Sequence, residues 1–292
     1  MKVYTLTATL TALALAAGAA GASTKLHGRI AFAAGPLEPG RSNIYVFDLA
    51  TQRVTRVTHD RGVHFDPTLS PDGRRIAFRS RIGAEDYEVR VVNRDGTGMR
   101  NLTRNPAMDY APAWSPDGAK IAFASERRFR LPHVWIMNAD GSHAHVLTRA
   151  YSGEYPSWSP DGKRIVFASN IPVTDTGFEL VVVNADGTNA RRLTRNDVYD
   201  MGPAWSPDGK WIAFYSGRDL PNGGHDVYVV RPDGSDVRRL THGGGELPAW
   251  SPDGRYIVYA APSGLVVIRP DGSEVARLGT GTSGPNFASW GR

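Results

Sequence analysis

The fold is decided by one stretch, Ala204-Trp205-Ser206-Pro207-Asp208-Gly209-Lys210-Trp211-Ile212-Ala213-Phe214. Pro207 and the pair Asp208-Gly209 supply the chemistry of a tight turn, in which the glycine is free to adopt a positive φ. The apolar run that follows is typical of a buried strand. The stretch therefore predicts a strand, a tight turn and a second strand.

The Ser-Pro-Asp-Gly core of this stretch occurs five times. The copies begin at Ser70, Ser115, Ser159, Ser206 and Ser251, at intervals of 45, 44, 47 and 45 residues. Such regular spacing indicates a repeat architecture. Each repeat holds two further strand-like segments joined by an Asp-Gly turn. Four short strands in one repeat of this length predict a blade of a β-propeller.

The two ends of the chain complement each other. The segment 27–32 resembles the second half of the hairpin, and the segment 287–292 resembles its first half. We expect the C-terminal strand to complete the N-terminal blade, because closing the ring hides both free sheet edges. The sequence predicts an all-β fold, a six-bladed β-propeller of four-stranded antiparallel blades over residues 23–292. The expected blades span 27–62 with 285–292, 63–107, 108–151, 152–197, 198–243 and 244–284.

The first 22 residues are interpreted as a secretory signal. Lys2 is followed by an uncharged segment rich in Leu and Ala, and Ala20-Gly21-Ala22 forms a small-residue cleavage site before Ser23. The apolar part is short for a membrane anchor, the competing interpretation. We therefore expect a periplasmic or secreted protein with no transmembrane span after cleavage.

The composition excludes several classes of function. The chain has no cysteine, which rules out disulfides, thiolate metal sites and a cysteine nucleophile. Its formal net charge is +5. Because solubility accounts for this charge in an exported protein, we expect no nucleic-acid partner. We also expect a monomer.

The repeat resembles a known family. Copies of Trp-Ser-Pro-Asp-Gly followed by Ile-Ala-Phe, Asp-Gly-Ser/Thr and Arg-x-Leu-Thr are similar to the propeller repeats of the TolB family, and they extend from Arg29 to Trp290. The resemblance implies a six-bladed periplasmic propeller, a fold that hosts many functions. TolB proteins carry an α/β domain before the propeller; here Ser23 to Gly28 alone precede the first blade, so we expect that domain to be missing. The hydrolase domain of peptidases that share the repeat is also absent from this sequence.

Acidic residues precede the tryptophan position in five repeats and are expected at one mouth of the channel. They are Asp66, Asp109, Glu154, Asp200 and Glu246, with His64 beside the first. One interpretation is a binding site for a partner or for a cation, Ca²⁺-like because all the ligands are oxygens. The other is structural, with each carboxylate capping its own loop. No resident cofactor is expected otherwise.

Arginines gather in the variable loops between the second and third strands. Arg79, Arg81, Arg127, Arg128, Arg130 and Arg218 lie there with Tyr87 and Phe129. Arginine and aromatic residues together are typical of protein-binding surfaces. We interpret this rim either as a partner-binding face or as a solvated basic surface.

These patterns favour a binding scaffold over an enzyme. No catalytic constellation is found in the sequence, and the histidines are scattered over different segment types. We expect a non-catalytic propeller that binds a protein or peptide of the cell envelope at a channel mouth. The alternative is a metal-dependent hydrolase or lyase acting in the channel.

Overall fold

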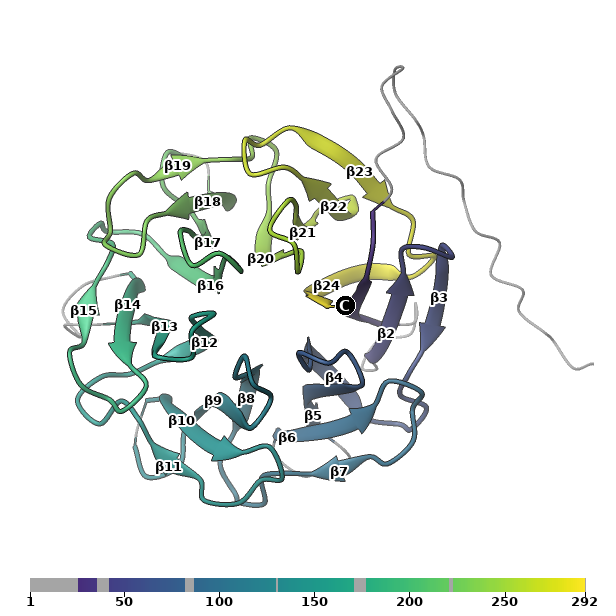
Figure 1. Ribbon diagram of the computed structural model, residues 1–292, viewed down its shortest axis with the longest axis horizontal. Coiled ribbons are helices and arrows are strands. Elements are labelled where there is room, and N and C mark those ends of the chain that lie inside the picture. Colours follow the sequence, from purple (N-terminus) through teal and green to yellow (C-terminus); the bar gives the residue numbers. More distant parts are fainter. Residues whose placement is uncertain are drawn as a thin grey trace, which may run out of the picture.

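The computed structural model describes residues 26–35, 42–81, 87–129, 131–170, 177–220 and 223–291. The segment 1–22, interpreted as a signal, lies outside the described residues. Six four-stranded antiparallel sheets stand around a central channel as the blades of a propeller (Figure 1). The described residues contain no helix, and therefore none that could span a membrane. The predicted fold class is confirmed.

Blades one to three contain the first eleven strands and the last one. Blade one consists of β24 (Ser283–Gly291), β1 (Arg29–Gly35), β2 (Asn43–Asp48) and β3 (Arg53–Arg56). Blade two consists of β4 (Val63–Leu69), β5 (Arg75–Arg81), β6 (Glu88–Asn93) and β7 (Arg100–Asn101). Blade three consists of β8 (Asp109–Trp114), β9 (Lys120–Ser125), β10 (His133–Asn138) and β11 (His145–Val146).

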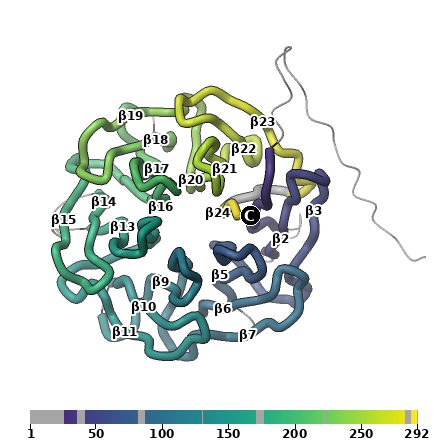
Figure 2. Tube along the Cα trace, viewed as in Figure 1, coloured from purple at the N-terminus to yellow at the C-terminus, as the bar shows by residue number. Residues whose placement is uncertain are grey.

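Blades four to six follow in chain order. Blade four consists of β12 (Glu154–Trp158), β13 (Arg164–Ser169), β14 (Glu179–Asn184) and β15 (Arg191–Arg192). Blade five consists of β16 (Asp200–Trp205), β17 (Ile212–Ser216), β18 (Asp226–Val230) and β19 (Arg238–Arg239). Blade six consists of β20 (Glu246–Trp250), β21 (Ile257–Ala261), β22 (Gly264–Ile268) and β23 (Glu274–Leu278). The innermost strands β24, β4, β8, β12, β16 and β20 surround the channel (Figures 1 and 2).

The repeated turn is fixed by its own side chains. In blade five, the Ser206 hydroxyl donates to Asp208 Oδ1 at 2.7 Å and accepts the Trp211 N–H at 2.9 Å. Gly209 closes the turn with a φ of 72° and an N–H bond of 2.9 Å to the Ser206 carbonyl. The Ser-Pro-Asp-Gly motif is therefore part of the scaffold.

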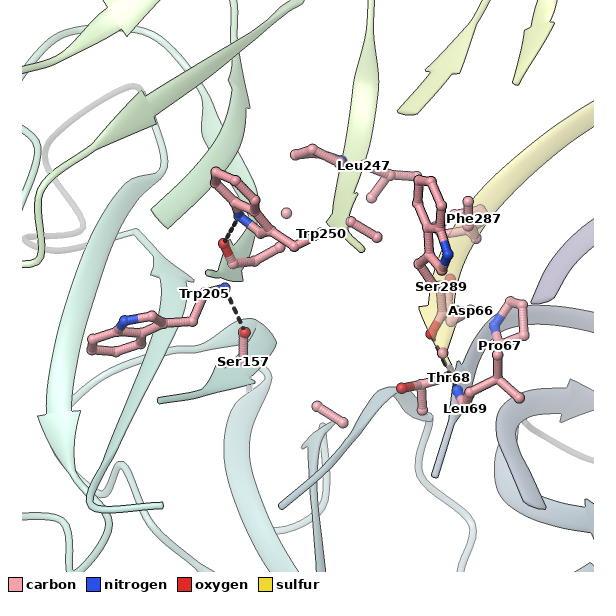
Figure 3. A pocket seen from close by; sticks show the side chains of 18 of the residues that line it. Asp66, Pro67, Thr68, Leu69, Ser157, Trp205, Leu247, Trp250, Phe287 and Ser289 are labelled. Carbon is pink, nitrogen blue, oxygen red and sulfur yellow. Dashed lines mark hydrogen bonds between the residues drawn. The ribbon is translucent and has the colours of Figure 1, made fainter. Parts of the chain in front are cut away.

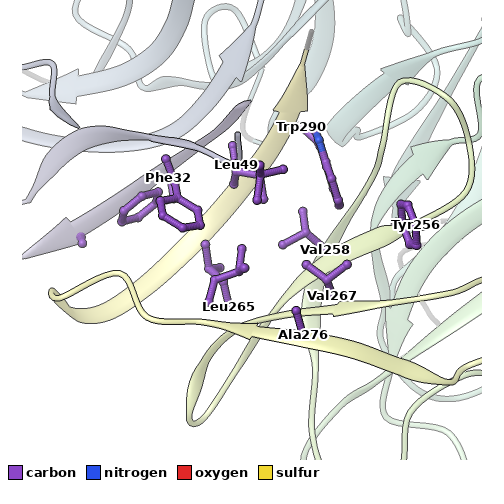
Figure 4. Close-up of a cluster of buried hydrophobic side chains, with 12 residues drawn as sticks. Phe32, Leu49, Tyr256, Val258, Leu265, Val267, Ala276 and Trp290 are labelled. Atoms are coloured by element: carbon purple, nitrogen blue, oxygen red, sulfur yellow. The ribbon is translucent and has the colours of Figure 1, made fainter. Parts of the chain in front are cut away.

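Ring closure is achieved as predicted. Strand β24 pairs with β1, bringing Trp290 opposite Ile30. Phe32 and Trp290 of blade one pack with Val258 and Leu265 of blade six in one buried apolar cluster (Figure 4). Equivalent clusters fill the other interfaces between blades, so the hydrophobic core consists of one apolar cluster between each pair of neighbouring blades.

The fourth strands of the middle blades are short. In blade four, only Arg191–Arg192 form a regular ladder. Beyond these two residues, the third and fourth segments are joined by single hydrogen bonds. The Leu193 N–H donates to the Leu180 carbonyl at 2.7 Å, and the Leu180 N–H donates to the Thr194 hydroxyl at 3.0 Å. The repeated Leu-Thr pair thus replaces part of the ladder.

Candidate functional site: the central channel

The channel has two mouths. Each innermost strand begins at the mouth formed by the loops that lead into it, the loop-side mouth, and ends at the mouth formed by the Ser-Pro-Asp-Gly turns, the turn-side mouth. A cavity of about 570 Å³ opens on the turn side. Its lining residues include turn prolines such as Pro71 and Pro207. Trp250, Leu247 and Phe287 also belong to the lining of this cavity (Figure 3). We call it the channel cavity.

The floor of the channel cavity is a ring to which each blade contributes one residue. These six residues, here called the channel ring, all have a positive φ between 49° and 58°: Asp66, Ala111, Tyr155, Gly202, Leu247 and Phe287. The register between the first and second strands shifts at this position in every blade. Such a bulge bends the strand and redirects its side chain.

Proline follows the channel ring in five blades, at Pro67, Pro112, Pro156, Pro203 and Pro248. The innermost strand is an edge strand, and proline is tolerated there because the missing N–H would face the channel. Sequence analysis did not identify the ring. The signal that could have found it is the position immediately before this repeated proline.

Asp66 is the acidic member of the ring and is 7% exposed. Its Oδ2 lies 3.1 Å from Arg79 Nε and accepts the Ala111 N–H at 3.3 Å. Its Oδ1 is buried and has no hydrogen-bond partner among the described residues. Burial raises the pKa of the carboxyl, and the charge of Arg79 opposes this rise only in part.

Arg79 lies beside the ring among aromatic side chains. Its guanidinium carbon is 4.9 Å from the Tyr87 ring centre, 5.0 Å from that of Phe65, and within 6 Å of those of Tyr110 and Phe287. Aromatic faces stabilise a cation at these distances. The arrangement holds a positive charge next to Asp66 in a partly buried site.

Asp109 and Asp200 are used within their own blades. Both are fully buried. Arg127 pairs with Asp109 at 2.5 Å, and Arg218 pairs with Asp200. In each blade an asparagine four residues earlier also donates to the aspartate. The arginines stack on aromatic rings of the same blade.

These pairs change the interpretation of the rim. Arg127 and Arg218 were grouped with the rim, interpreted as a partner-binding face or as a solvated basic surface, and they point inward because a buried carboxylate needs a counter-charge. The acidic residues of the channel mouth and the arginines of the rim, which the sequence analysis treated as separate groups, form ion pairs with one another. Such pairs can hold the loops in place and leave these carboxylates neutralised.

His64 occupies in blade two the position of Asp109 in blade three. It is fully buried, with Nε2 2.7 Å from Asp60 Oδ1 and Nδ1 2.9 Å from the Ser80 hydroxyl. Burial lowers the pKa of the imidazole, outweighing the nearby Asp60 carboxylate. His64 therefore pairs with Asp60 rather than with its expected neighbour Asp66.

The two glutamates lie on the loop side of the ring. Burial raises the pKa of Glu154, although the Tyr110 side chain bonds to it and opposes the rise. Glu246 is exposed and pairs with His225 Nδ1 at 2.8 Å. The predicted acids thus have five separate environments rather than one shared centre.

The remaining rim arginines differ in position. Arg81 and Arg128 are exposed. The first lies 5.0 Å over the Tyr87 ring, and the second 5.8 Å over the Trp135 ring. Arg130 lies outside the described residues.

The cation site, one of the two interpretations of the acidic residues, gains no support from this geometry. Within the described ranges, no group of three or more His, Asp or Glu side chains could hold a metal ion. The acidic residues are apart from one another, and three of them face an arginine.

Fold and cavity together define a class, the six-bladed β-propeller with a pocket at one end of its channel. The family described as TolB beta propeller domain matches residues 27–171 and 150–288. The chain therefore belongs to the TolB β-propeller family, and the predicted resemblance is confirmed.

Individual curated proteins resemble this chain over a short segment. The Tol-Pal system protein TolB of Francisella tularensis subsp. tularensis (strain WY96-3418) is 33% identical over 67 residues, which cover 23% of this chain and 15% of that protein. The aligned segment thus spans a small part of the relative.

Solved structures share the fold. The crystal structure of TolB from Acinetobacter baumannii superposes with a TM-score of 0.78 at 22% identity, over 90% of this chain and 66% of that chain. An oligogalacturonate lyase in complex with manganese reaches a TM-score of 0.59 at 20% identity, over 85% and 73%. At these identities the likeness extends to the fold alone.

Proposed function

We propose that this propeller is a non-catalytic scaffold that is exported to the cell envelope and binds a protein or peptide partner at its central channel. Membership of the TolB β-propeller family supports this function. The relatives carry the name Tol-Pal system protein TolB, which associates them with a protein assembly. Residues 1–22 are the proposed signal, with cleavage near Ala22 and Ser23.

The observation that carries the proposal is the channel cavity. It is about 570 Å³ in volume, and its lining combines prolines, tryptophans and aliphatic side chains with nearly as much polar surface. A concave site of this size with convergent polar groups can bury a ligand or a peptide side chain. Of the predicted site residues, Asp66 lines this cavity.

We assign partner docking primarily to the turn-side mouth. At the loop-side mouth, Asp109 and Asp200 are neutralised by their arginines, which reduces what that mouth offers a partner. Glu246, Arg81 and Arg128 keep exposed side chains on that side and are proposed as secondary contacts. No described cluster favours the metal-dependent hydrolase or lyase.

The test is capture of a partner from an envelope extract by the immobilised protein, residues 23–292. Ala111→Phe fills the cavity floor with the side chain that blade one already carries at this position, Phe287, whose backbone has the same conformation. Its melting temperature is measured first, so that loss of binding is not loss of the fold. Arg100→Ala, on the exposed strand β7, is the matched control. A stoichiometric partner held by the wild type and the control, and lost with Ala111→Phe, is expected. Equal capture by all three proteins would contradict docking in the channel.

A further inference from the structure

Comparison of the six blades shows two coupled departures in blade two. At the channel ring, the other blades have Ala, Tyr, Gly, Leu and Phe, and blade two has Asp66. At the position of Arg79 in the second strand, the other blades have Ala33, Ala124, Ala168, Tyr215 and Ala260. The other five blades fold without a charged residue at either position, so the blade structure itself does not need the charges of Asp66 and Arg79.

The two departures meet in space. Asp66 Oδ2 lies 3.1 Å from Arg79 Nε at the floor of the channel cavity. A buried ion pair is seldom more stable than apolar residues of similar volume. The fold therefore does not require this pair, and a binding role accounts for its place at the end of a pocket.

The polar side chains of the channel cavity are the hydroxyls of residues such as Thr68, Ser157 and Ser289, which can donate or accept, and one carboxylate. Nine of the lining residues are prolines, which have no N–H to donate. The Trp250 indole already donates to the Ala204 carbonyl, and the Trp290 indole to the His27 carbonyl. Asp66 is the charged residue of the lining, and its Oδ1 lacks a partner among the described residues. A ligand group that complements Asp66 must donate a hydrogen bond to this carboxylate and carry no negative charge there.

The geometry of Asp66 narrows the ligand further. Its Oδ2 is already engaged by Arg79 and the Ala111 N–H, so one oxygen remains. A guanidinium binds a carboxylate best with two parallel bonds, whereas an ammonium is a compact charge that needs one. The walls beside Asp66 include Leu247, Phe287 and Tyr155, which can cover an aliphatic chain.

We propose that the channel cavity binds a lysine side chain of the partner, with its methylenes against Leu247 and Phe287 and its ammonium on Asp66. Arg79 keeps the carboxylate in place from the opposite side of the ring. This inference rests on the proposed function, in that it names the chemistry of the partner at the turn-side mouth.

The test uses two capped tripeptides, Ala-Lys-Ala and Ala-norleucine-Ala, titrated into the protein and followed by NMR of the probe. The two differ in the ammonium while sharing the aliphatic stem. Saturable binding of the lysine probe is expected, with roughly tenfold weaker binding of the norleucine probe, the worth of one charged hydrogen bond. Asp66→Asn should weaken the lysine probe to the same degree. Asp186→Asn, in the exposed turn between β14 and β15 and outside the cavity lining, is the matched control and should bind as the wild type does.

A second variant separates binding from folding. Asp66→Ala/Arg79→Ala gives blade two the residues of blade three, Ala111 and Ala124, and should melt as the wild type does while failing to bind the lysine probe. The inference is overturned if the lysine probe shows no saturable binding, if norleucine binds equally, or if the Asp66 variants bind normally. Capture of a partner that Ala111→Phe abolishes would then still support the proposed function.

Discussion

The Ser157 hydroxyl of blade four accepts a hydrogen bond of 3.1 Å from the backbone N–H of Trp205 in blade five. Elsewhere the contact has another form: the Trp158 indole donates to the Ala113 carbonyl at 3.2 Å, and the Trp250 indole to the Ala204 carbonyl at 3.1 Å. The Trp205 indole nitrogen has no partner among the described residues. Neighbouring blades are thus joined next to the channel either by an indole or by a serine.

Ser157→Ala should lower the free energy of unfolding by about 1 kcal/mol, because it leaves the buried Trp205 N–H without its acceptor. Urea denaturation measures the change. Ser235→Ala, in an exposed turn, is the control for loss of a hydroxyl and should cost less. An equal loss in both variants would contradict a role in joining blades.

Arg79→Ala alone should destabilise the protein by about 3 kcal/mol, because Asp66 then remains buried without its counter-charge. Adding Asp66→Ala should restore most of this loss, since the other blades are stable with uncharged residues at both places. Chemical denaturation of both single variants and the double variant gives the coupling energy. A double variant as unstable as Arg79→Ala would show that the fold depends on the pair.

Arg127→Ala should also cost about 3 kcal/mol by leaving Asp109 uncompensated. Arg128→Ala, at the next position and exposed, should change stability by less than about 0.5 kcal/mol. Thermal and urea unfolding of the two variants provide the comparison. If Arg127→Ala proved as harmless as Arg128→Ala, the inward pairing would not stabilise the loop. A binding experiment on the rim should therefore use Arg81 and Arg128.

His64 should make stability dependent on pH. The pKa of the buried imidazole lies below its ordinary value of 6.5, with burial the main cause and Arg90 and Arg56 adding to it. The unfolded chain then takes up a proton near pH 6.5 and the folded protein does not, so stability is lost as the pH falls below this value. The pKa of Asp60 is also lowered, because the bonds from Gly62 and His64 outweigh burial, and its contribution is lost only in stronger acid.

The measurement is the free energy of unfolding between roughly pH 5 and pH 8, in the wild type and in His64→Asn. The variant should have a flatter profile over this range. His145→Asn, which replaces an exposed histidine, is the control and should keep the wild-type slope. A profile unchanged by His64→Asn would assign the slope to other groups.

The repeat pattern was sufficient to predict the fold, and it was less informative about the site. The five Ser-Pro-Asp-Gly copies and the two half-hairpins at the ends predicted the blades and the closure through β24. The channel ring was missed because Leu247 and Phe287 do not favour a positive φ, and tertiary structure imposes it there.

The pairing of the inward arginines was not predicted, although the sequence contains a signal for it. Asn105, Asp109 and Arg127 have the same spacing as Asn196, Asp200 and Arg218. A repeated spacing of this kind indicates a structural unit, as it did for the turn. Composition alone grouped these arginines with Arg81 and Arg128, because residue type does not show which way a side chain points.

The channel ring has a consequence for how such proteins can diversify. Its members share one backbone conformation and come from six separate blades, so the same place in the fold accepts side chains of different size and charge. Ala, Asp, Leu, Tyr and Phe already occupy equivalent places. Gly202 is the exception, because a Cβ there would lie 2.8 Å from the Tyr215 ring. Recognition by this fold can therefore evolve at five positions around a single floor, while the repeat that builds the ring stays constant.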